Sequence, residues 1–366
     1  MRICIYTEDL RFPLDEGIKK VAYTLIDMLS KECNVLGLCK YGMNMENPLI
    51  RVIPTNRLLL CYRLKRKIKS FDPNIVLYIP SASMTFYSFL RLKLLKFYAP
   101  NAKAVMLILQ PRNLLKLQKK IIQVFLRPDL ILAPSNKICN HVRTFGCEAE
   151  FIPLGVDIQK FTPVSEKRKR ELREKYEIPQ DKFVILHVGH INYGRNLRTL
   201  IPLQRNNNQV IIVSSTSTPE DCPKDVVLQK ELEMKGIIVM DRYIKSIEEI
   251  YQLSDCYIFP VTFEGGCISI PLSVLEAMAC NLPVVTTKFG GLPDIFKEGE
   301  GFIFININSQ EEIKSKINIA MITHALKTRE MVEQYTWDKV LEKIRGIFNE
   351  ILKKNRICTD RAFNNS

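Results

Sequence analysis

Hydrophobic residues in the first part of the chain follow two alternating patterns. Short apolar runs at residues 2–7, 34–39, 75–79, 104–109, 130–133 and 150–153 predict strands. Residues 17–30 instead carry apolar side chains every three or four positions, which predicts an amphipathic helix. Strands that alternate with helices are typical of a parallel, doubly wound sheet.

A second set of alternating elements begins after Pro163. Strands are expected at 183–188, 209–214, 236–240, 256–260 and 283–286, and helices at 165–176, 196–203, 247–253, 271–280, 310–321 and 337–354. The length of 366 residues allows two hydrophobic cores, so we predict two Rossmann-like domains at 1–162 and 163–335. The last helix, at 336–354, is expected to pack back toward the first domain, and 355–366 to form a polar, frayed tail.

Composition adds expectations about the compartment. The N-terminal residues form a strand pattern and not a signal peptide, and no apolar run approaches the ~20 residues that span a bilayer. The eleven cysteines include no CxxC pair, which favours reduced, packed thiols in a cytoplasmic protein.

The stretch 263–285 carries the strongest chemical signal. A loop with Glu264, Gly265 and Gly266 leads through Pro271 into a helix that contains Glu276. A loop that enters a helix N-terminus offers free amides and a positive dipole end, which suit a phosphate group. A carboxylate on that helix can accept hydrogen bonds from the two hydroxyls of a ribose. The pattern therefore indicates a nucleotide site.

Residues 276–285, read as Glu-Ala-Met-Ala-Cys-Asn-Leu-Pro-Val-Val, resemble the donor-site signature of retaining GT-B glycosyltransferases of the family-four (group 1) type. Two departures stand out. Ile268 occupies the position eight residues before Glu276 where the family has a glutamate, and Asn281 replaces a glycine. Residues 152–157 and 187–196 resemble two further segments of that family, the interdomain segment and the turn after the first strand of the second domain.

The resemblance implies a GT-B fold, two Rossmann-like domains facing a cleft, and a donor site for a nucleoside diphosphate-sugar. It implies that Arg195, Glu264 and Glu276 are the catalytic residues, with Arg195 on the departing diphosphate and Glu276 on the ribose. Guanidinium groups bind two phosphate oxygens at once. The other donor-binding candidates are Gly17, Gln110, His190, Tyr243, Gly265, Gly266, Cys267, Ser269 and Ile270.

Each candidate also has a plainer interpretation. Glu276 would complement a helix dipole, Arg195 would be a solvated loop residue, and Gly17 would belong to an ordinary turn. His190 and Tyr243 would serve packing. No Asp-x-Asp motif, the usual cation ligand of another nucleotide-sugar enzyme class, occurs in the sequence, so we expect neither a metal nor another cofactor.

The net charge of +14 is concentrated in one region. Between residues 47 and 128 lie sixteen lysines and arginines but one acid, Asp72. Three stretches there interleave cations with apolar residues, a pattern that favours an anionic bilayer surface. In GT-B enzymes the first domain binds the acceptor. We therefore expect an acceptor or membrane face at Lys65, Arg66, Lys67, Arg91, Lys93, Lys96, Lys116, Lys119 and Lys120. The alternative is a solvated basic face over a core-facing apolar stripe.

The sequence thus predicts a cytoplasmic transferase, peripheral on the inner face of the membrane, for polysaccharide or glycolipid biosynthesis. It would move a sugar with retention and without a metal to a lipid-linked or anionic acceptor. Two alternatives stay open. One is a non-catalytic nucleotide-sugar-binding partner of a glycan assembly pathway, and the other is an RNA-binding protein that uses the basic face, although nucleic acid is not expected because no binding motif accompanies the charge.

Overall fold

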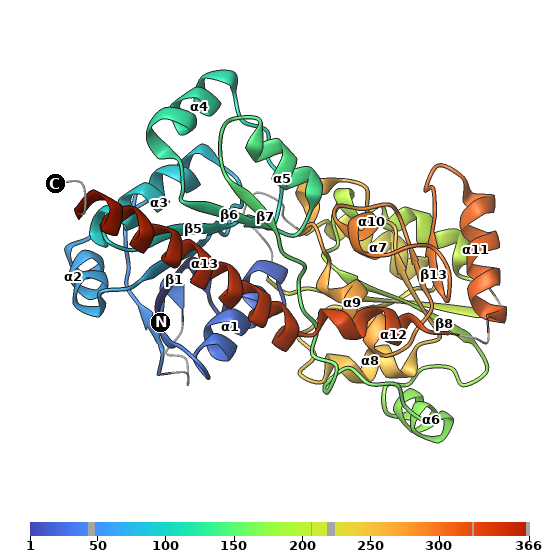
Figure 1. The fold of residues 1–366 in the computed structure, drawn as a ribbon. Coiled ribbons are helices and arrows are strands. Elements are labelled where there is room, and N and C mark those ends of the chain that lie inside the picture. Colours follow the sequence, from blue (N-terminus) through green and yellow to red (C-terminus); the bar gives the residue numbers. More distant parts are fainter. Residues whose placement is uncertain (43–47, 206, 218–223, 324–325, 364–366) are drawn as a thin grey trace. The chain divides into compact units, whose positions relative to one another are not determined.

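The computed structural model describes residues 1–42, 48–205, 207–217, 224–323 and 326–363. These residues form two compact units (Figure 1). The first unit contains residues 1–153 and 338–366, and the second contains 154–337. The division falls nine residues before the expected boundary at 162, because residues 154–157 belong to the second unit through the bridge between Val156 and Thr336.

The first unit is built on a seven-stranded parallel sheet with the order β3-β2-β1-β4-β5-β6-β7. The strands are β1 (Arg2–Leu10), β2 (Asn34–Gly42), β3 (Ile50–Val52), β4 (Ile75–Ile79), β5 (Lys103–Leu107), β6 (Leu130–Ala133) and β7 (Ala149–Phe151). All five residues of β4 are buried, as in a strand covered on both faces. The order reverses between β1 and β4, which makes their carboxyl ends the switch point where ligands bind in such sheets.

Helices complete the first unit, and alternate residues of its strands face opposite layers. They are α1 (Gly17–Leu29), α2 (Tyr62–Phe71), α3 (Phe86–Tyr98), α4 (Lys116–Ile121) with the π-helical turn η1 (Ile122–Leu126), α5 (Asn136–Arg143) and α13 (Trp337–Phe363). Cys4 and Tyr6 of β1 join a core cluster with residues of α2, α3, η1 and α5. Nearly all of α13 belongs to this unit by its contacts, and the helix runs to Phe363, beyond the expected end at 354.

The second unit has a six-stranded parallel sheet with the order β10-β9-β8-β11-β12-β13. Its strands are β8 (Phe183–Gly189), β9 (Asn208–Ser214), β10 (Ile238–Met240), β11 (Cys256–Phe259), β12 (Val284–Thr286) and β13 (Phe302–Phe304). The switch point lies between β8 and β11. Asp255 fixes the start of both strands, since it accepts a hydrogen bond from the Val184 amide at 2.6 Å and one from Arg173 at 2.5 Å.

The helices of the second unit are α6 (Glu166–Lys175), α7 (Val226–Met234), α8 (Ile247–Leu253), α9 (Leu272–Ala279), α10 (Leu292–Ile295), α11 (Gln310–Ile322) and α12 (Thr328–Val332). The helix expected at 196–203 is a 3-10 helix, η3 (Leu197–Leu203). Pro202 lies inside it and has no amide proton for an α-helical bond. The prediction of two Rossmann-like parallel-sheet domains is confirmed.

Candidate functional site

Two loops of the second unit leave the sheet at its switch point. One follows β8 and contains the single turn η2 (Tyr193–Arg195). The other follows β11 and contains the turn η4 (Glu264–Gly266) before α9 begins at Leu272. The ring of Phe263 lies between them, because a Cβ atom on Gly194 would be 3.1 Å from that ring and one on Gly265 would be 2.7 Å from it. The structure thus brings the segments of Arg195 and Glu264 together.

Arg195 has an unusual environment for a cation. Its side chain belongs to a residue that is only 5% exposed, and its Nε atom is buried without a hydrogen-bond partner. Across the described part of the chain, its guanidinium forms no hydrogen bond and no ion pair. Buried charges are almost always paired because desolvation opposes their burial. The geometry is therefore that of a cation prepared for an anion from outside the chain.

Asparagine residues fix the turn that carries Arg195. Asn192 caps η2 by accepting a hydrogen bond from the Gly194 amide at 3.1 Å. Asn196 has a left-handed backbone (φ 55°), which asparagine tolerates. The side-chain amide of Asn196 donates a hydrogen bond to the carbonyl of Pro260 at 2.9 Å and so connects the β8 loop to the end of β11. Sequence reasoning missed both asparagines, although asparagine is a residue that turns favour.

His187 on β8 places a neutral hydrogen-bond acceptor beside this cation. Its Nδ1 lies 2.9 Å from the carbonyl oxygen of Ile258, so Nδ1 carries the proton and Nε2 is the acceptor. Burial lowers the pKa of His187 to about 3, and the charge of Arg195 adds to this effect. Nε2 is buried without a partner. A Cβ atom on Gly189 would be 2.9 Å from Nη1 of Arg195 and 3.4 Å from Nε2 of His187, so both groups border the same small space.

Glu276 lies on α9 with its carboxylate held in place. The residue is 5% exposed, and Tyr251 of α8 donates a hydrogen bond to Oε2 at 2.9 Å. Burial, followed by the charge of Glu276, raises the pKa of Tyr251 well above its usual value, so the tyrosine stays a donor. Pro271 is the N-cap of α9, and no side chain caps the amides of that helix end. A buried carboxylate and uncapped amides therefore belong to the same short helix.

The loop residues 264–270 divide into an outer and an inner part. Glu264, Gly265, Gly266 and Cys267 are half-buried, whereas Ser269 is 2% exposed and Ile270 is fully buried. Ile268, in the position of the family glutamate, is a core residue at 3% exposure. Gly290 supports the inner part. It has a φ of +53°, and a Cβ atom there would overlap the Ser269 carbonyl, to which Gly291 donates at 2.8 Å.

Two other candidates of the second unit each follow a strand. His190 directly follows β8 and is 8% exposed. Tyr243 follows β10 and is 40% exposed.

Two candidates belong to the first unit. Gly17 begins α1, but the carboxylate of Glu16 accepts a hydrogen bond from the Lys19 amide at 3.0 Å and so caps this helix itself. Burial raises the pKa of Glu16. Gln110 is held through its backbone, since its amide donates to Ser83 Oγ at 2.6 Å and its carbonyl accepts from the same hydroxyl at 2.6 Å.

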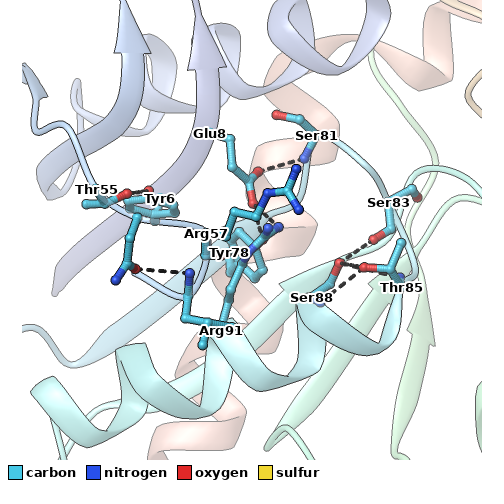
Figure 2. Close-up of polar contacts among 12 residues, drawn as sticks. Tyr6, Glu8, Thr55, Arg57, Tyr78, Ser81, Ser83, Thr85, Ser88 and Arg91 are labelled. Atoms are coloured by element: carbon cyan, nitrogen blue, oxygen red, sulfur yellow. Dashed lines mark hydrogen bonds and ion pairs between the residues drawn. The ribbon is translucent and has the colours of Figure 1, made fainter. Parts of the chain in front are cut away.

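The switch point of the first unit holds a polar cluster that sequence reasoning missed (Figure 2). Glu8 of β1 accepts hydrogen bonds from Tyr78, from the Ser81 amide at 2.8 Å and from Arg91 at 2.9 Å. Arg91 also donates to the carbonyl of Arg57 at 2.8 Å. Burial and the charge of Glu8 raise the pKa of Tyr78. The cluster joins α3 and the loop at 57 to the ends of β1 and β4.

The structure contradicts part of the predicted acceptor or membrane face. The Arg91 side chain is 17% exposed and is held by Glu8, so it does not project outward. Lys96 donates to the Ala102 carbonyl and lies 3.4 Å from Asp129, so it is also turned inward. Lys119 is half-buried. Of the nine cations predicted for this face, six are exposed: Lys65, Arg66, Lys67, Lys93, Lys116 and Lys120.

Within the residues that the structure describes, no group of three or more histidine, cysteine, aspartate or glutamate side chains is placed to hold a metal ion. No helix in the same ranges has both the length and the apolar character needed to cross a membrane.

Comparison with known proteins gives matches of sequence and of fold. Residues 168–344 match the family described as glycosyl transferases group 1. Sulfoquinovosyl transferase SQD2 of Arabidopsis thaliana is 27% identical over 236 residues, which cover 60% of this chain and 44% of that protein. The capsular polysaccharide biosynthesis glycosyltransferase CapM of Staphylococcus aureus is 26% identical over 239 residues, which cover 61% of this chain and 58% of that protein. The chain spans about half the length of the curated relatives that it matches.

The fold is shared with solved structures. The crystal structure of Anabaena Alr3699/HepE in complex with UDP-glucose has a TM-score of 0.76 at 16% identity and covers 96% of this chain and 100% of that chain. Residues 168–344 are thus similar to the group 1 glycosyltransferase family, and the fold is the GT-B fold of the solved structures.

Proposed function

We propose that this chain transfers a sugar from a nucleoside diphosphate-sugar to an acceptor hydroxyl, with retention of configuration and without a metal. One observation carries the proposal: among the residues that the structure describes, Arg195 is a buried cation without an anionic partner, and its unit also holds a helix start without a side-chain cap and a buried carboxylate on that helix. A diphosphate would bind the cation and the amides, and a ribose diol would donate hydrogen bonds to the carboxylate. The titles of the Anabaena structures name UDP and UDP-glucose, which supports the same class of donor here.

The proposed reaction breaks the bond between the anomeric carbon and the diphosphate, and both electrons leave with the phosphate oxygen. The acceptor oxygen then bonds to that carbon, and the proton that it loses offsets the charge on the diphosphate. Arg195 and the amides of residues 265–270 would stabilise the departing charge in a site with little water, where such interactions are strongest. Glu276, fixed by Tyr251, would hold the ribose. Glu264 would contact the donor sugar.

For the acceptor we propose a lipid-linked or anionic molecule. The exposed cations of α2 and α3, with Lys116 and Lys120, provide the attraction. The names of SQD2 and CapM, a sulfoquinovosyl transferase and a capsular polysaccharide enzyme, support glycolipid or polysaccharide biosynthesis as the setting. We also propose a cytoplasmic location at the inner membrane surface. A non-catalytic nucleotide-sugar-binding partner is the second candidate, since Ile268 is packed in the core where the family has a glutamate.

A ligand panel tests the donor. UDP-, GDP- and ADP-glucose are added to the purified protein, and the melting temperature is followed. One donor is expected to raise the melting temperature. At a donor concentration of a hundred times the dissociation constant, binding stabilises the folded protein by ~2.7 kcal/mol. Incubation of that donor should then release the free nucleoside diphosphate. Binding without release would support the non-catalytic partner, and the absence of binding by any nucleotide-sugar would overturn the proposal.

A further inference from the structure

Four large apolar side chains stand in solvent on the segment formed by α4 and η1. Leu115, Leu117, Val124 and Phe125 are 70%, 69%, 62% and 65% exposed. We call these four residues the apolar ridge. Folded proteins normally keep such groups scattered, and a cluster of them marks a contact surface.

The sequence analysis left open a core-facing apolar stripe in this segment, but the packing does not place these four residues in the core. Helix α4 contributes no buried residue. Only Ile122 and Leu126 of η1 enter the core cluster, and they are four positions apart on one side of the turn. Val124 and Phe125 lie between them in sequence and therefore point away from the core. The ridge is thus an apolar face without a partner among the described residues of its own unit.

Helix α2 differs in this respect and serves as a contrast. Its apolar residues Leu64 and Ile68 are fully buried, and its cations Lys65, Arg66 and Lys67 are exposed. Among its apolar residues Tyr62 is the exposed one, at 76%, so this helix offers its cations with one exposed ring. The α4–η1 segment offers charge and apolar area together.

Charge identifies the partner of the ridge. Lys116, Lys120 and Arg127 are exposed next to it, and the sequence has no aspartate or glutamate between residues 73 and 128. Lysine and arginine can extend their charged ends to a polar surface while their stems follow apolar groups. Apolar side chains bracketed by cations match the interface of an anionic bilayer, where acyl chains lie below negative headgroups. RNA would satisfy the cations but leave the apolar area in water.

We propose that the apolar ridge inserts into the headgroup region of an anionic bilayer, with Lys116, Lys120 and Arg127 on the headgroups. This inference rests on one part of the proposed function, the lipid-linked acceptor, because docking on the bilayer would bring such an acceptor to the first unit. The nucleotide-sugar site belongs to the second unit and is tested separately.

Vesicle cosedimentation of the full chain tests the ridge. Vesicles of phosphatidylcholine and phosphatidylglycerol in equal amounts are compared with vesicles of phosphatidylcholine alone. The variant Leu117→Gln/Phe125→Gln keeps every charge, and we expect roughly tenfold weaker binding to the anionic vesicles, the factor that corresponds to about 1.4 kcal/mol. The matched control is Val227→Gln/Met234→Gln on α7, whose side chains are equally exposed at 74% and 79%. It should bind like the wild type.

Tryptophan fluorescence gives a direct readout of insertion. The chain has a single tryptophan, Trp337, which is 7% exposed in the second unit. Phe125→Trp should show a blue shift with anionic vesicles and quenching by brominated acyl chains, and Val227→Trp should show neither. The inference is overturned if the wild type ignores anionic vesicles, if the Gln variant binds them equally well, or if only RNA binds. In each case the donor panel can still succeed, and a failed panel with intact vesicle binding would overturn only the donor proposal.

Discussion

Replacement of Arg195 by methionine should stabilise the ligand-free protein and weaken donor binding. Arg195 is 5% exposed, and its guanidinium has no partner among the described residues. Methionine keeps the length and the apolar stem and removes the desolvated charge. Most substitutions of buried residues destabilise, so an increase in stability together with a loss of binding is a distinctive pair of results.

The magnitudes follow from burial. Leaving a buried donor such as Nε without a partner costs about 1–3 kcal/mol, and a gain of 1 kcal/mol raises the melting temperature of a domain of this size by about 2–4 °C. Removing one member of a buried, hydrogen-bonded charge pair costs about 2–5 kcal/mol in binding. The affinity for the nucleoside diphosphate should therefore fall by at least about thirtyfold.

Calorimetry and thermal unfolding measure both effects on the same samples. Arg198→Met is the matched control, because the Arg198 side chain is 57% exposed and pairs with Glu231 at 2.8 Å. Surface substitutions of this kind change stability by less than about 0.5 kcal/mol, and binding should stay unchanged. A less stable Arg195→Met protein with normal affinity would refute the reasoning.

Three further predictions concern the surroundings of Arg195 and Glu276. The pKa of His187 is about 3 in the folded protein and about 6.5 in the unfolded chain, so its contribution to stability is full above pH 6.5 and is lost as the pH falls toward 3. Urea unfolding should therefore show a loss of about 2 kcal/mol in the free energy of unfolding between pH 7 and pH 5. The variant His187→Asn should abolish this loss. Tyr251→Phe removes the donor to Glu276 and should cost about 1–3 kcal/mol in urea unfolding, whereas an unchanged midpoint would show that another group replaces it. Gly290→Ala should destabilise the protein by at least about 1 kcal/mol, since the backbone is left-handed there and a Cβ atom has no space. Gly346→Ala, on α13 where a Cβ atom meets nothing, should stabilise it by about 0.5–1 kcal/mol. Equal melting temperatures for the two variants would contradict this reasoning.

The main elements of the fold could be predicted from the sequence because parallel sheets bury both faces of their strands. β4 and β6 occur at the expected residues 75–79 and 130–133. The strands β3 and β13, with three residues each, were missed, whereas the equally short β7, β10 and β12 were predicted. The last helix was expected to end at 354 but runs to Phe363, because the polar composition of the residues after 354 resembles that of a frayed tail.

The candidate site was predictable where a residue type carries the chemistry. Arg195 and Glu276 were named from their motif, but nothing in the sequence shows that the guanidinium is buried without a partner. His187, Tyr251 and Gly290 were missed because their roles depend on contacts between residues far apart in the chain. The inward turn of Arg91 depends in the same way on Glu8, which is 83 residues away.

The last helix has a consequence for the order in which the protein can fold. Residues 338–363 belong to the first unit, where Val340, Ile344 and Phe348 are buried and Arg345 pairs with Glu32. A ribosome synthesises residues 1–153 before the second unit, yet the helix that completes their unit follows only after residue 337. The second unit is a single continuous segment and has all its residues earlier. The unit begun first is therefore completed after the other one, and its nascent form exposes apolar surface that a chaperone could recognise.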